Sequence, residues 1–321
     1  MSVSGYVTLP GTDLVVSRIC LGGNRLGGEL DQAGSFALLD AFVAGGGTFV
    51  DSAHVYANWI AGNERSSSEK TLGRWLKARG GAKGVVIATK GGSPEPETPH
   101  LKRLDEASIR RDVAEALDNL GVPSLDLFYL HRDDPDRPVA EMLGVVEALR
   151  REGLVRHYAC SNWSGARMEE AAAIARREGW PGFVASQCEW SLATRNAGTA
   201  SGDLLQMDAA MLDVHRRLGL PAIPYSSQAR GFFDKVADGT LDAMTASRYD
   251  NPANQRRAAT LAAVARRHGA TPTQTMLAAM MRSPFLTIPI VGCRTTEQVA
   301  GSLAALKVTL EPGEVETILA L

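Results

Sequence analysis

The sequence is poor in cysteine and carries almost no net charge. Only four of its 321 residues are cysteines, and none of them forms a Cys-x-x-Cys pair: Cys20, Cys160, Cys188 and Cys293. This spacing predicts buried free thiols in a reducing compartment, and not a disulfide framework or a zinc site. The formal charge of −2 gives no electrostatic basis for binding nucleic acid or an anionic membrane surface.

Long hydrophobic runs are missing as well. The opening MSVSGYVTLPG has neither the basic start nor the apolar run of a secretory signal, and no stretch approaches the ~20 apolar residues of a membrane helix. With 45% hydrophobic and 22% charged residues, the composition is that of a soluble globular protein. Together with the missing secretory signal and the free thiols, it leads us to expect a cytoplasmic protein. No change in composition marks a linker, so we expect a single domain over residues 1–321.

What the sequence does contain is a regular alternation of short apolar runs and amphipathic segments. The opening YVTLPGTDLVVSR predicts a β-hairpin that turns at residues 10–13. Apolar runs of strand length then occur at Ile19–Leu21, Thr48–Val50, Val85–Ala88, Leu125–Leu130, Val155–Ala159, Phe183–Ala185, Ala222–Pro224 and Leu286–Val291. Short runs of this kind are typical of parallel strands that are buried on both faces.

Helices are expected between these runs, where apolar residues recur at spacings of three and four. One stripe covers residues 36–43 and ends at the glycines of residues 45–47, and a second stripe covers residues 72–76. Further helices are predicted at 109–120, 139–151, 166–177, 204–218, 255–268, 272–282 and 295–306, and from residue 312 onward. The helix at 255–268 is one more than the alternation requires, which indicates an insertion.

Eight strand–helix alternations suit either a doubly wound sheet or a closed barrel. No Gly-x-Gly-x-x-Gly phosphate loop lies between a predicted strand and its helix, because the glycines at 22, 23, 27 and 28 do not fit that spacing. The predicted fold is therefore an α/β (β/α)₈ TIM barrel with an N-terminal β-hairpin and extra helices near the C-terminus.

Polar residues follow most of the predicted strands: Asp51, Lys90, His131, Asn162, Gln187 and Tyr225. In a parallel barrel these strand ends meet at one rim, where such enzymes place their chemistry. Buried charges must be paired, and Asp51 with Lys90 is the expected pair. Tyr56 lies five residues after Asp51, close enough to fold over the same rim. A neighbouring ammonium is expected to lower the tyrosine pKa from about 10 and to suit Tyr56 to proton donation.

Each of these residues also has an ordinary structural interpretation. An Asp after a strand is often a turn former, a Lys is often a solvated loop residue, and Tyr56 could simply pack against Trp59. A metal-dependent hydrolase using Asp51, His54 and His131 is another alternative. With six histidines and no His-x-His or His-Glu-x-x-His motif, metal ligation has weak support, and no metal is expected.

Five segments carry a resemblance to a known family: FVDSAHVY, VVIATKGG, DLFYLHRDDP, ACSNW and PYSSQARGFF. Their content, order and spacing resemble those of the bacterial-type, NADP-dependent aldo-keto reductase superfamily, from the hairpin to about residue 305. The resemblance implies a (β/α)₈ barrel that binds a nicotinamide cofactor and reduces aldehydes or ketones, or oxidises alcohols. It also implies that Asp51, Tyr56, Lys90 and His131 are a catalytic tetrad. Tyr56 would protonate the carbonyl oxygen, Lys90 would tune Tyr56, and His131 would orient the carbonyl.

The same resemblance implies that Asp51 and a further set of residues bind the cofactor. Ser161, Asn162 and Gln187 match positions that hold the nicotinamide carboxamide, and Tyr225 matches the aromatic residue that stacks on the ring. The positions around the pyrophosphate are matched by Ser226, Ser227, Gln228 and Arg230 after the seventh strand and by Gly23 and Asn24 after the first.

The chain departs from the family pattern after the last strand. Many relatives carry Lys-Ser, then Arg, then Glu-Asn here for the adenosine 2′-phosphate and adenine, whereas this chain has Gly292-Cys293, then Gln298, then Gly301-Ser302. Arg294 and Thr295 are candidate substitutes, although residues 295–298 also fit a helix capping box. NADPH is the expected cofactor, and NADH remains an alternative.

The substrate is expected to be a small carbonyl compound or alcohol in an apolar pocket with one polar end. The candidate contacts are Trp59, Trp163 and His131. A hypothesis of a different class is a regulatory or redox-sensing subunit that keeps the fold and the nicotinamide but turns over little substrate.

Overall fold

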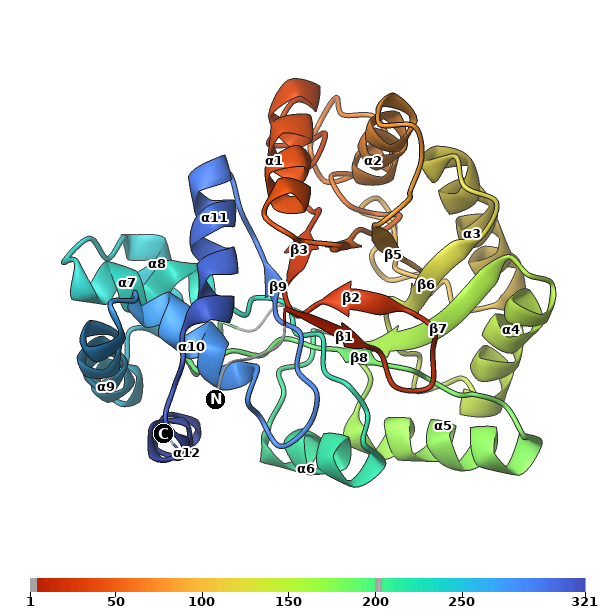
Figure 1. Cartoon of the computed structure of the whole chain (residues 1–321). Helices are drawn as coiled ribbons and strands as arrows, with labels where there is room; N and C mark the ends of the chain where they lie inside the picture. Colours follow the sequence, from red (N-terminus) through yellow and green to blue (C-terminus); the bar gives the residue numbers. More distant parts are fainter. Residues whose placement is uncertain (1–4, 200–201, 203, 321) are drawn as a thin grey trace.

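The strands of the sheet run parallel and curl. The computed structural model describes residues 5–199, 202 and 204–320. Within this part of the chain, a seven-stranded sheet has the order β8-β7-β6-β5-β4-β3-β9, and every pairing is parallel. The strands are β3 (Cys20–Gly22), β4 (Phe49–Asp51), β5 (Val86–Gly91), β6 (Leu125–Leu130), β7 (Val155–Ser161), β8 (Ser186–Gln187) and β9 (Ile290–Val291). Figure 1 shows the curled sheet with α1 to α6 along its outside.

A short segment, residues 221–225, is hydrogen-bonded to β8 on one side and to the run that leads into β9 on the other. The Ile223 amide donates to the carbonyl of Ser186 in β8 at 2.9 Å, and the Ala222 amide donates to the carbonyl of Leu286 at 2.8 Å. The Ile288 amide returns a bond to the Ala222 carbonyl at 2.9 Å. The run predicted as a strand at Ala222–Pro224 therefore forms isolated parallel bridges on both sides, instead of a longer ladder.

The eight apolar runs predicted the strand positions to within a few residues. The sixth run, Phe183–Ala185, precedes β8, and only the last two residues of the eighth run form β9. β8 and β9 are each two residues long, because a residue belongs to a strand only where a neighbouring strand pairs with it. Their length is therefore set by where the neighbouring strands end, and the length of the apolar run does not determine it.

The predicted helices are present, and most begin at a capping side chain. They are α1 (Gln32–Ala44), α2 (Ser67–Ala78), α3 (Glu106–Leu120), α4 (Val139–Arg151), α5 (Gly165–Glu178), α6 (Ala209–Leu218), α9 (Pro252–His268), α10 (Pro272–Met280), α11 (Thr296–Ala304) and α12 (Pro312–Leu319). The predicted start of the helix at 204–218 was wrong. Asp208 caps α6 at Ala209, and the Leu205 amide bonds instead to the Asn162 side chain.

Two short helices and two 3₁₀ turns were not predicted. The segment after residue 225 folds as η1 (Ala229–Gly231), α7 (Phe232–Ala237) and α8 (Ala243–Tyr249) before α9, and η2 (Ala305–Lys307) follows α11. Phe232, Phe233 and Tyr249 are buried, and the Phe232 ring packs against both of the others. These helices are therefore held by aromatic packing and show no long apolar stripe. Figure 1 shows α7, α8 and α9 grouped to one side of the sheet.

The predicted N-terminal hairpin is confirmed. Strands β1 (Tyr6–Thr8) and β2 (Val15–Ser17) pair antiparallel, and Figure 1 shows them lying across the sheet. Leu9, Leu14 and Val16 pack with the inward-facing strand residues in one buried cluster. Because β2 leads directly into the amino end of β3, the hairpin covers the amino ends of the strands and leaves their carboxyl ends for the polar side chains.

No helix in the described ranges has the combined length and apolarity needed to cross a membrane.

Candidate active site

The carboxyl ends of β4 and β5 hold a buried ion pair. The Lys90 ammonium lies 2.6 Å from Asp51 Oδ2, and the two side chains are 0% and 2% exposed. Lys90 Nζ also donates to the Tyr56 hydroxyl at 2.9 Å and to the Ser52 carbonyl at 2.7 Å. The pairing of Asp51 with Lys90 predicted from the strand ends is thus confirmed, and Tyr56 lies against the same ammonium.

Tyr56 reaches the ion pair because the loop after β4 turns back over the strand ends. The His54 amide donates to the Lys90 carbonyl at 2.9 Å, and the Tyr56 amide donates to the Ala53 carbonyl at 3.0 Å. These bonds hold the phenol so that its hydroxyl also approaches Asp51 Oδ2 at 3.4 Å. The second carboxylate oxygen of Asp51 accepts from Gln187 Nε2 at 2.9 Å.

The pKa of Tyr56 is raised well above that of an ordinary phenol. Burial of the hydroxyl is the largest cause, and the Asp51 carboxylate adds to it. The lowered Tyr56 pKa that was predicted from Lys90 alone is therefore wrong, because the phenolate would lie beside a carboxylate as well as an ammonium. Burial also lowers the pKa of Lys90, against the opposing effect of Asp51. Tyr56 consequently holds its proton across the physiological pH range.

His131 follows β6 and faces the Tyr56 ring edge-on, with the ring centroids 5.9 Å apart. Burial lowers the pKa of His131 well below its ordinary value, and the positive charges of Arg132 and Lys90 act in the same direction. The imidazole is therefore neutral at neutral pH. Its buried Nδ1 has no hydrogen-bond partner among the described residues, which leaves this atom available to a ligand or water.

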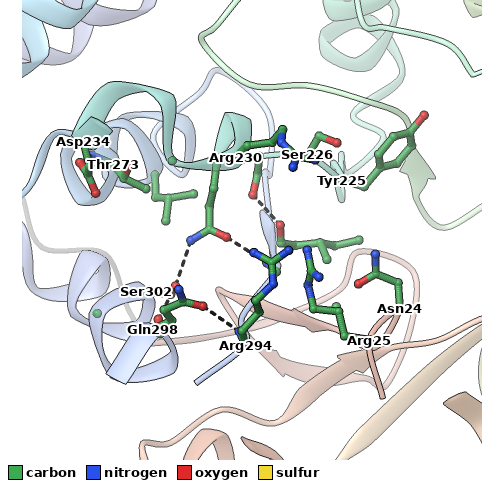
Figure 2. Close-up of a pocket in the computed structure, with 18 of the residues that line it drawn as sticks. Asn24, Arg25, Tyr225, Ser226, Arg230, Asp234, Thr273, Arg294, Gln298 and Ser302 are labelled. Atoms are coloured by element: carbon green, nitrogen blue, oxygen red, sulfur yellow. Dashed lines mark hydrogen bonds between the residues drawn. The ribbon is translucent and has the colours of Figure 1, made fainter. Parts of the chain in front are cut away.

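A cavity of about 680 Å³ opens from this cluster. Asp51 and Tyr56 line one end, and the wall then continues through Tyr225 and the loop at 226–231 to the start of α11. Figure 2 shows Tyr225 at one end and Asp234 with Thr273 at the other, so the cavity is elongated. Its shape suits a long ligand that places one end beside Tyr56.

A family model decides the classification of the chain. The model described as "Aldo/keto reductase family" matches residues 18–321. The chain belongs to the aldo/keto reductase family. It is accordingly an NAD(P)H-dependent oxidoreductase, of a family that carries out carbonyl reduction.

Named relatives agree with this classification. The chain is 29% identical to the uncharacterized oxidoreductase YrpG of Bacillus subtilis, an alignment that covers 95% of this chain and 92% of that protein. It is 26% identical to protein tas of Escherichia coli, covering 95% and 94%. It is 27% identical to an aryl-alcohol dehydrogenase of Phanerodontia chrysosporium whose name specifies NADP(+), covering 96% and 79%.

In this aldo/keto reductase, Asn162 is held rigidly at the end of β7. Its Oδ1 accepts from the Tyr225 hydroxyl at 2.8 Å and from the Leu205 amide at 3.1 Å, while its Nδ2 donates to Ser161 Oγ at 3.1 Å and to the His131 carbonyl at 3.3 Å. Asn162 adopts φ 60°, a conformation that asparagine tolerates better than most residues. The structure thus brings Ser161, Asn162 and Tyr225 together beside His131.

The loop after residue 225 is strained and tied to the last strand. Ser226, Ala229 and Arg230 have positive φ, a backbone strain that tends to occur at ligand sites. Ser227 Oγ donates to the Ile290 carbonyl at 2.5 Å. Gln228 Oε1 accepts from the Gly292 amide at 2.9 Å, and its Nε2 donates to Ser302 Oγ at 3.1 Å. These contacts fix one long wall of the cavity.

Gly23 and Asn24 lie on the opposite side, after β3. The Gly23 amide donates to the Asp51 carbonyl at 2.7 Å, and a Cβ at Gly23 would stand only 2.7 Å from that oxygen. The close approach explains the glycine and anchors this loop to the strand that carries Asp51. Asn24 lines the cavity directly.

Thr295 and Gln298 form half of the predicted capping box. The Gln298 amide donates to Thr295 Oγ1 at 3.3 Å, so Thr295 caps α11 as the spacing predicted. The Gln298 side chain instead accepts from the Arg294 amide at 2.7 Å. Gln298 and Arg294 both line the cavity, whereas the Thr295 hydroxyl serves the helix.

The two tryptophans predicted to contact substrate differ in position. Trp59 is 55% exposed and lines the cavity. Its ring meets the Tyr56 ring edge-on, with the ring centroids 6.2 Å apart. Trp163 is 0% exposed, donates from Nε1 to the Arg132 carbonyl at 3.0 Å and packs against Phe183. We therefore correct the assignment of Trp163. It is a core residue that supports the loop after His131, and its buried ring has no surface for substrate.

Sequence reasoning missed three basic residues of the cavity. Arg25, Lys235 and Arg248 line its wall, on the loop after β3 and on the unpredicted helices α7 and α8. A single basic residue in a loop has no periodic signature. For Arg25, a sequence signal was the glutamate four residues later, Glu29, with which it forms an ion pair.

The residues of the alternative metal-dependent site are engaged elsewhere. His54 Nε2 lies 2.6 Å from the Glu115 carboxylate, while Asp51 pairs with Lys90. Within the described ranges, no cluster of three or more His, Cys, Asp and Glu side chains is arranged to hold a metal ion.

Proposed function

We propose that the protein uses NADPH to reduce an aldehyde or ketone to the alcohol, or catalyses the reverse oxidation, with Tyr56 as the general acid. The observation that carries this proposal is the contact of the Tyr56 hydroxyl with the buried Lys90–Asp51 pair at the end of an elongated cavity. The assigned family and the NADP(+)-named relative support the reaction class and the choice of cofactor.

Tyr56 holds the proton that the reaction needs. Because its pKa is raised, the phenol is protonated before substrate arrives. Its hydroxyl would turn from Asp51 toward the substrate oxygen and release the proton to that oxygen as negative charge develops there. The Lys90 ammonium, 2.9 Å from the phenol oxygen, then stabilises the phenolate that remains.

His131 orients the reacting carbonyl. The neutral imidazole lies beside Tyr56 and can offer one N–H to the carbonyl oxygen without adding a second proton to the site. A preorganised donor of this kind stabilises the oxyanion-like transition state by several kcal/mol. Trp59, at the rim next to Tyr56, would contact the rest of the substrate.

The cavity fits a nicotinamide dinucleotide by its length and its donors. Ser161, Asn162 and Tyr225 would hold the nicotinamide end, with Gln187 acting through Asp51. The two tethered walls at residues 226–230 and 292–298, with Gly23 and Asn24 opposite, would hold the phosphates. When bound, the reduced cofactor supplies the hydride.

We also infer that the sheet closes into a (β/α)₈ barrel, with residues 221–225 as its seventh strand. The bonds from this segment to β8 on one side and to residues 286–290 on the other support closure. Closure would bring His131, Asn162 and Tyr225 to the same rim as Tyr56, as the proposed mechanism requires.

The test of the proposed acid is Tyr56→Phe. We expect it to bind NADPH normally, because the ring is kept, and to lower kcat for aldehyde reduction by about 10²–10⁴-fold. Binding is measured by nicotinamide fluorescence, and turnover by absorbance of the reduced cofactor with a panel of aldehydes. Tyr158→Phe is the matched control, since it removes a buried phenol that bonds to Glu147 of α4 and does not line the cavity. If Tyr56→Phe kept full activity, another acid would be required. Tight NADPH binding by the unmodified protein without turnover would favour a regulatory or redox-sensing subunit.

A further inference from the structure

Tyr129 is a buried phenol next to the active site that the proposed mechanism does not use. It lies in β6, two residues before His131, and is 0% exposed. The register of β5 and β6 places Tyr129 directly opposite Lys90, and neighbouring residues of paired strands point to the same face of a sheet. Tyr129 therefore packs on the inner face of the sheet, beside the lysine that contacts Tyr56.

The Lys90 ammonium lies over two aromatic rings. Its Nζ is 4.6 Å from the centroid of the Tyr56 ring and 5.9 Å from the centroid of the Tyr129 ring. A cation over the face of a ring is attracted by the electrons of the ring, and the attraction is larger where water is excluded. Because Lys90 and Tyr129 are both fully buried, this contact is made away from solvent.

The hydroxyl of Tyr129 contributes little to this contact. It has no hydrogen-bond partner among the described residues. Burial raises the pKa of Tyr129 well above that of an ordinary phenol, and the Asp51 carboxylate adds to the rise, so the phenol stays neutral. Gln187 acts on this pKa in the opposite direction, but its side-chain amide donates to Asp51. The ring face, and not the hydroxyl, is thus the part of Tyr129 that meets the ammonium.

Lys90 needs stabilisation beyond its hydrogen bonds. Its ammonium already donates to Asp51 Oδ2, the Ser52 carbonyl and the Tyr56 hydroxyl, which uses all three of its protons. Burial lowers the pKa of Lys90 despite the opposing effects of Asp51 and Cys20, and the positive charge of Arg132 lowers it further. An aromatic face is a group that can stabilise this cation without a further hydrogen bond.

The inference rests on the proposed role of Tyr56 as general acid. We propose that Tyr129 is a positioning residue for this reaction, and that its ring face stabilises the Lys90 ammonium and holds it against the Tyr56 hydroxyl. Tyr129 does not line the cavity, so it acts through Lys90 and touches neither substrate nor cofactor. Any loss of the ammonium weakens the stabilisation of the phenolate that Tyr56 becomes when it releases its proton.

Two substitutions separate the ring from the hydroxyl. Tyr129→Phe keeps the ring face, so kcat should stay within about twofold of the unmodified protein. Tyr129→Leu removes the face and should lower kcat about three- to tenfold in both reaction directions, with KM and cofactor binding unchanged. The phenolate also becomes less stable, so the apparent pKa in the pH profile of alcohol oxidation should rise by about 0.5–1 in Tyr129→Leu.

Phe128→Leu is the matched control for a loss of packing. Phe128 is the preceding residue of β6 and is equally buried, but it faces the layer under the helices. This variant should lose stability in urea as Tyr129→Leu does, because a buried ring is replaced by a smaller side chain in both. Its pH profile should match that of the unmodified protein. A purely structural role of Tyr129 would leave the pH profile of Tyr129→Leu unchanged as well.

NMR spectroscopy of the full-length protein with ¹³C-labelled lysine tests the contact without turnover. The Lys90 Cε signal is assigned by its absence from Lys90→Met. In Tyr129→Leu this signal should lose the ring-current shift of one ring and titrate at lower pH, whereas in Tyr129→Phe it should stay in place.

An unchanged Lys90 signal in Tyr129→Leu would overturn the proposal. Equal effects of Tyr129→Phe and Tyr129→Leu would overturn it too, because the hydroxyl would then be the acting group. If the unmodified protein turned over no carbonyl compound or alcohol, the proposed function would fail, and the NMR comparison would still decide whether the Tyr129 ring stabilises the ammonium.

Discussion

Tyr56 and His131 lie side by side at the end of the cavity, and their protonation states predict the pH dependence of both reaction directions. Burial and two positive neighbours lower the pKa of His131, so it is already neutral at about pH 6, and the raised pKa of Tyr56 keeps the phenol protonated to about pH 9. We expect kcat for carbonyl reduction to be constant between about pH 6 and 8. Alcohol oxidation needs Tyr56 as a base, so its kcat should rise with pH over the same range.

The measurement is steady-state turnover in both directions across this pH range, with saturating cofactor and substrate. An inflection near pH 6.5 in the reduction profile that disappears in His131→Gln would show that the imidazole titrates at its ordinary pKa. That result would contradict the neutral histidine assigned to this site.

Among single residues, charge placement could be predicted and protonation could not. Asp51 and Lys90 follow neighbouring parallel strands, and the requirement that buried charges be paired was enough to predict their contact. The direction of the Tyr56 pKa depends on how deeply the hydroxyl is buried and on its distance to Asp51, and neither can be read from spacing. Trp163 shows the same limit, since a residue next to a site residue can point into the core.

At the level of elements, long helices were predictable and short elements were not. Helices α3 and α5 combine an apolar stripe with a capping Asp or Ser, two local signals that agree. By contrast, β8 and β9 are two residues long, and their pairing is set by neighbouring strands. The short helices α7 and α8 rest on a few aromatic contacts, so no periodic pattern indicates them.

Packing between α2 and α3 predicts opposite effects for two similar substitutions. A Cβ at Gly73 in α2 would lie 2.0 Å from the Asn119 carbonyl oxygen of α3, whereas a Cβ at Gly144 in α4 would have its nearest neighbour, Trp180, at 3.8 Å. Gly73→Ala should lower the free energy of unfolding by about 1–3 kcal/mol through overpacking. Gly144→Ala should raise it by about 0.5–1 kcal/mol through helix propensity.

Urea denaturation of the two variants and the unmodified protein measures both changes. Because the substitution is chemically the same and both sites are in the middle of a helix, each variant is the control for the other. A gain in stability for Gly73→Ala would mean that α2 and α3 can move apart without loss of stability. The close contact at Gly73 would then not hold α2, and with it the preceding loop that carries Tyr56, in place.

At the scale of the whole molecule, the strands lie between two apolar layers, and this explains why their positions could be predicted from apolar runs in the sequence. Along β6, Leu127 and Tyr129 face an inner cluster, while Phe128 and Leu130 face the layer under the helices. Because both faces are buried, the run is continuously apolar, and this pattern predicted parallel strands. The inner cluster also contains Ile223 and Ile288, which come from segments that form isolated bridges and short pairings. The order of the strands and the closure of the sheet depend on these long-range contacts and could not be read from any one run.

Closure of the sheet can be tested by amide hydrogen exchange. If residues 221–225 are the seventh strand of a closed barrel, the amides of Ala222, Ile223 and Ile288 are protected by bonds to both neighbours, and they open only when the barrel opens. Peptides covering residues 220–226 and 286–292 should therefore exchange as slowly as those covering β6 and β7, whose pairing lies in the middle of the sheet. In a sheet with two free ends, the peptides at β8 and β9 would exchange first, well before β6. Faster exchange confined to these two peptides would contradict closure. The cavity wall that contains Tyr225 would then not belong to the same rim as the strand ends that hold Tyr56 and Lys90.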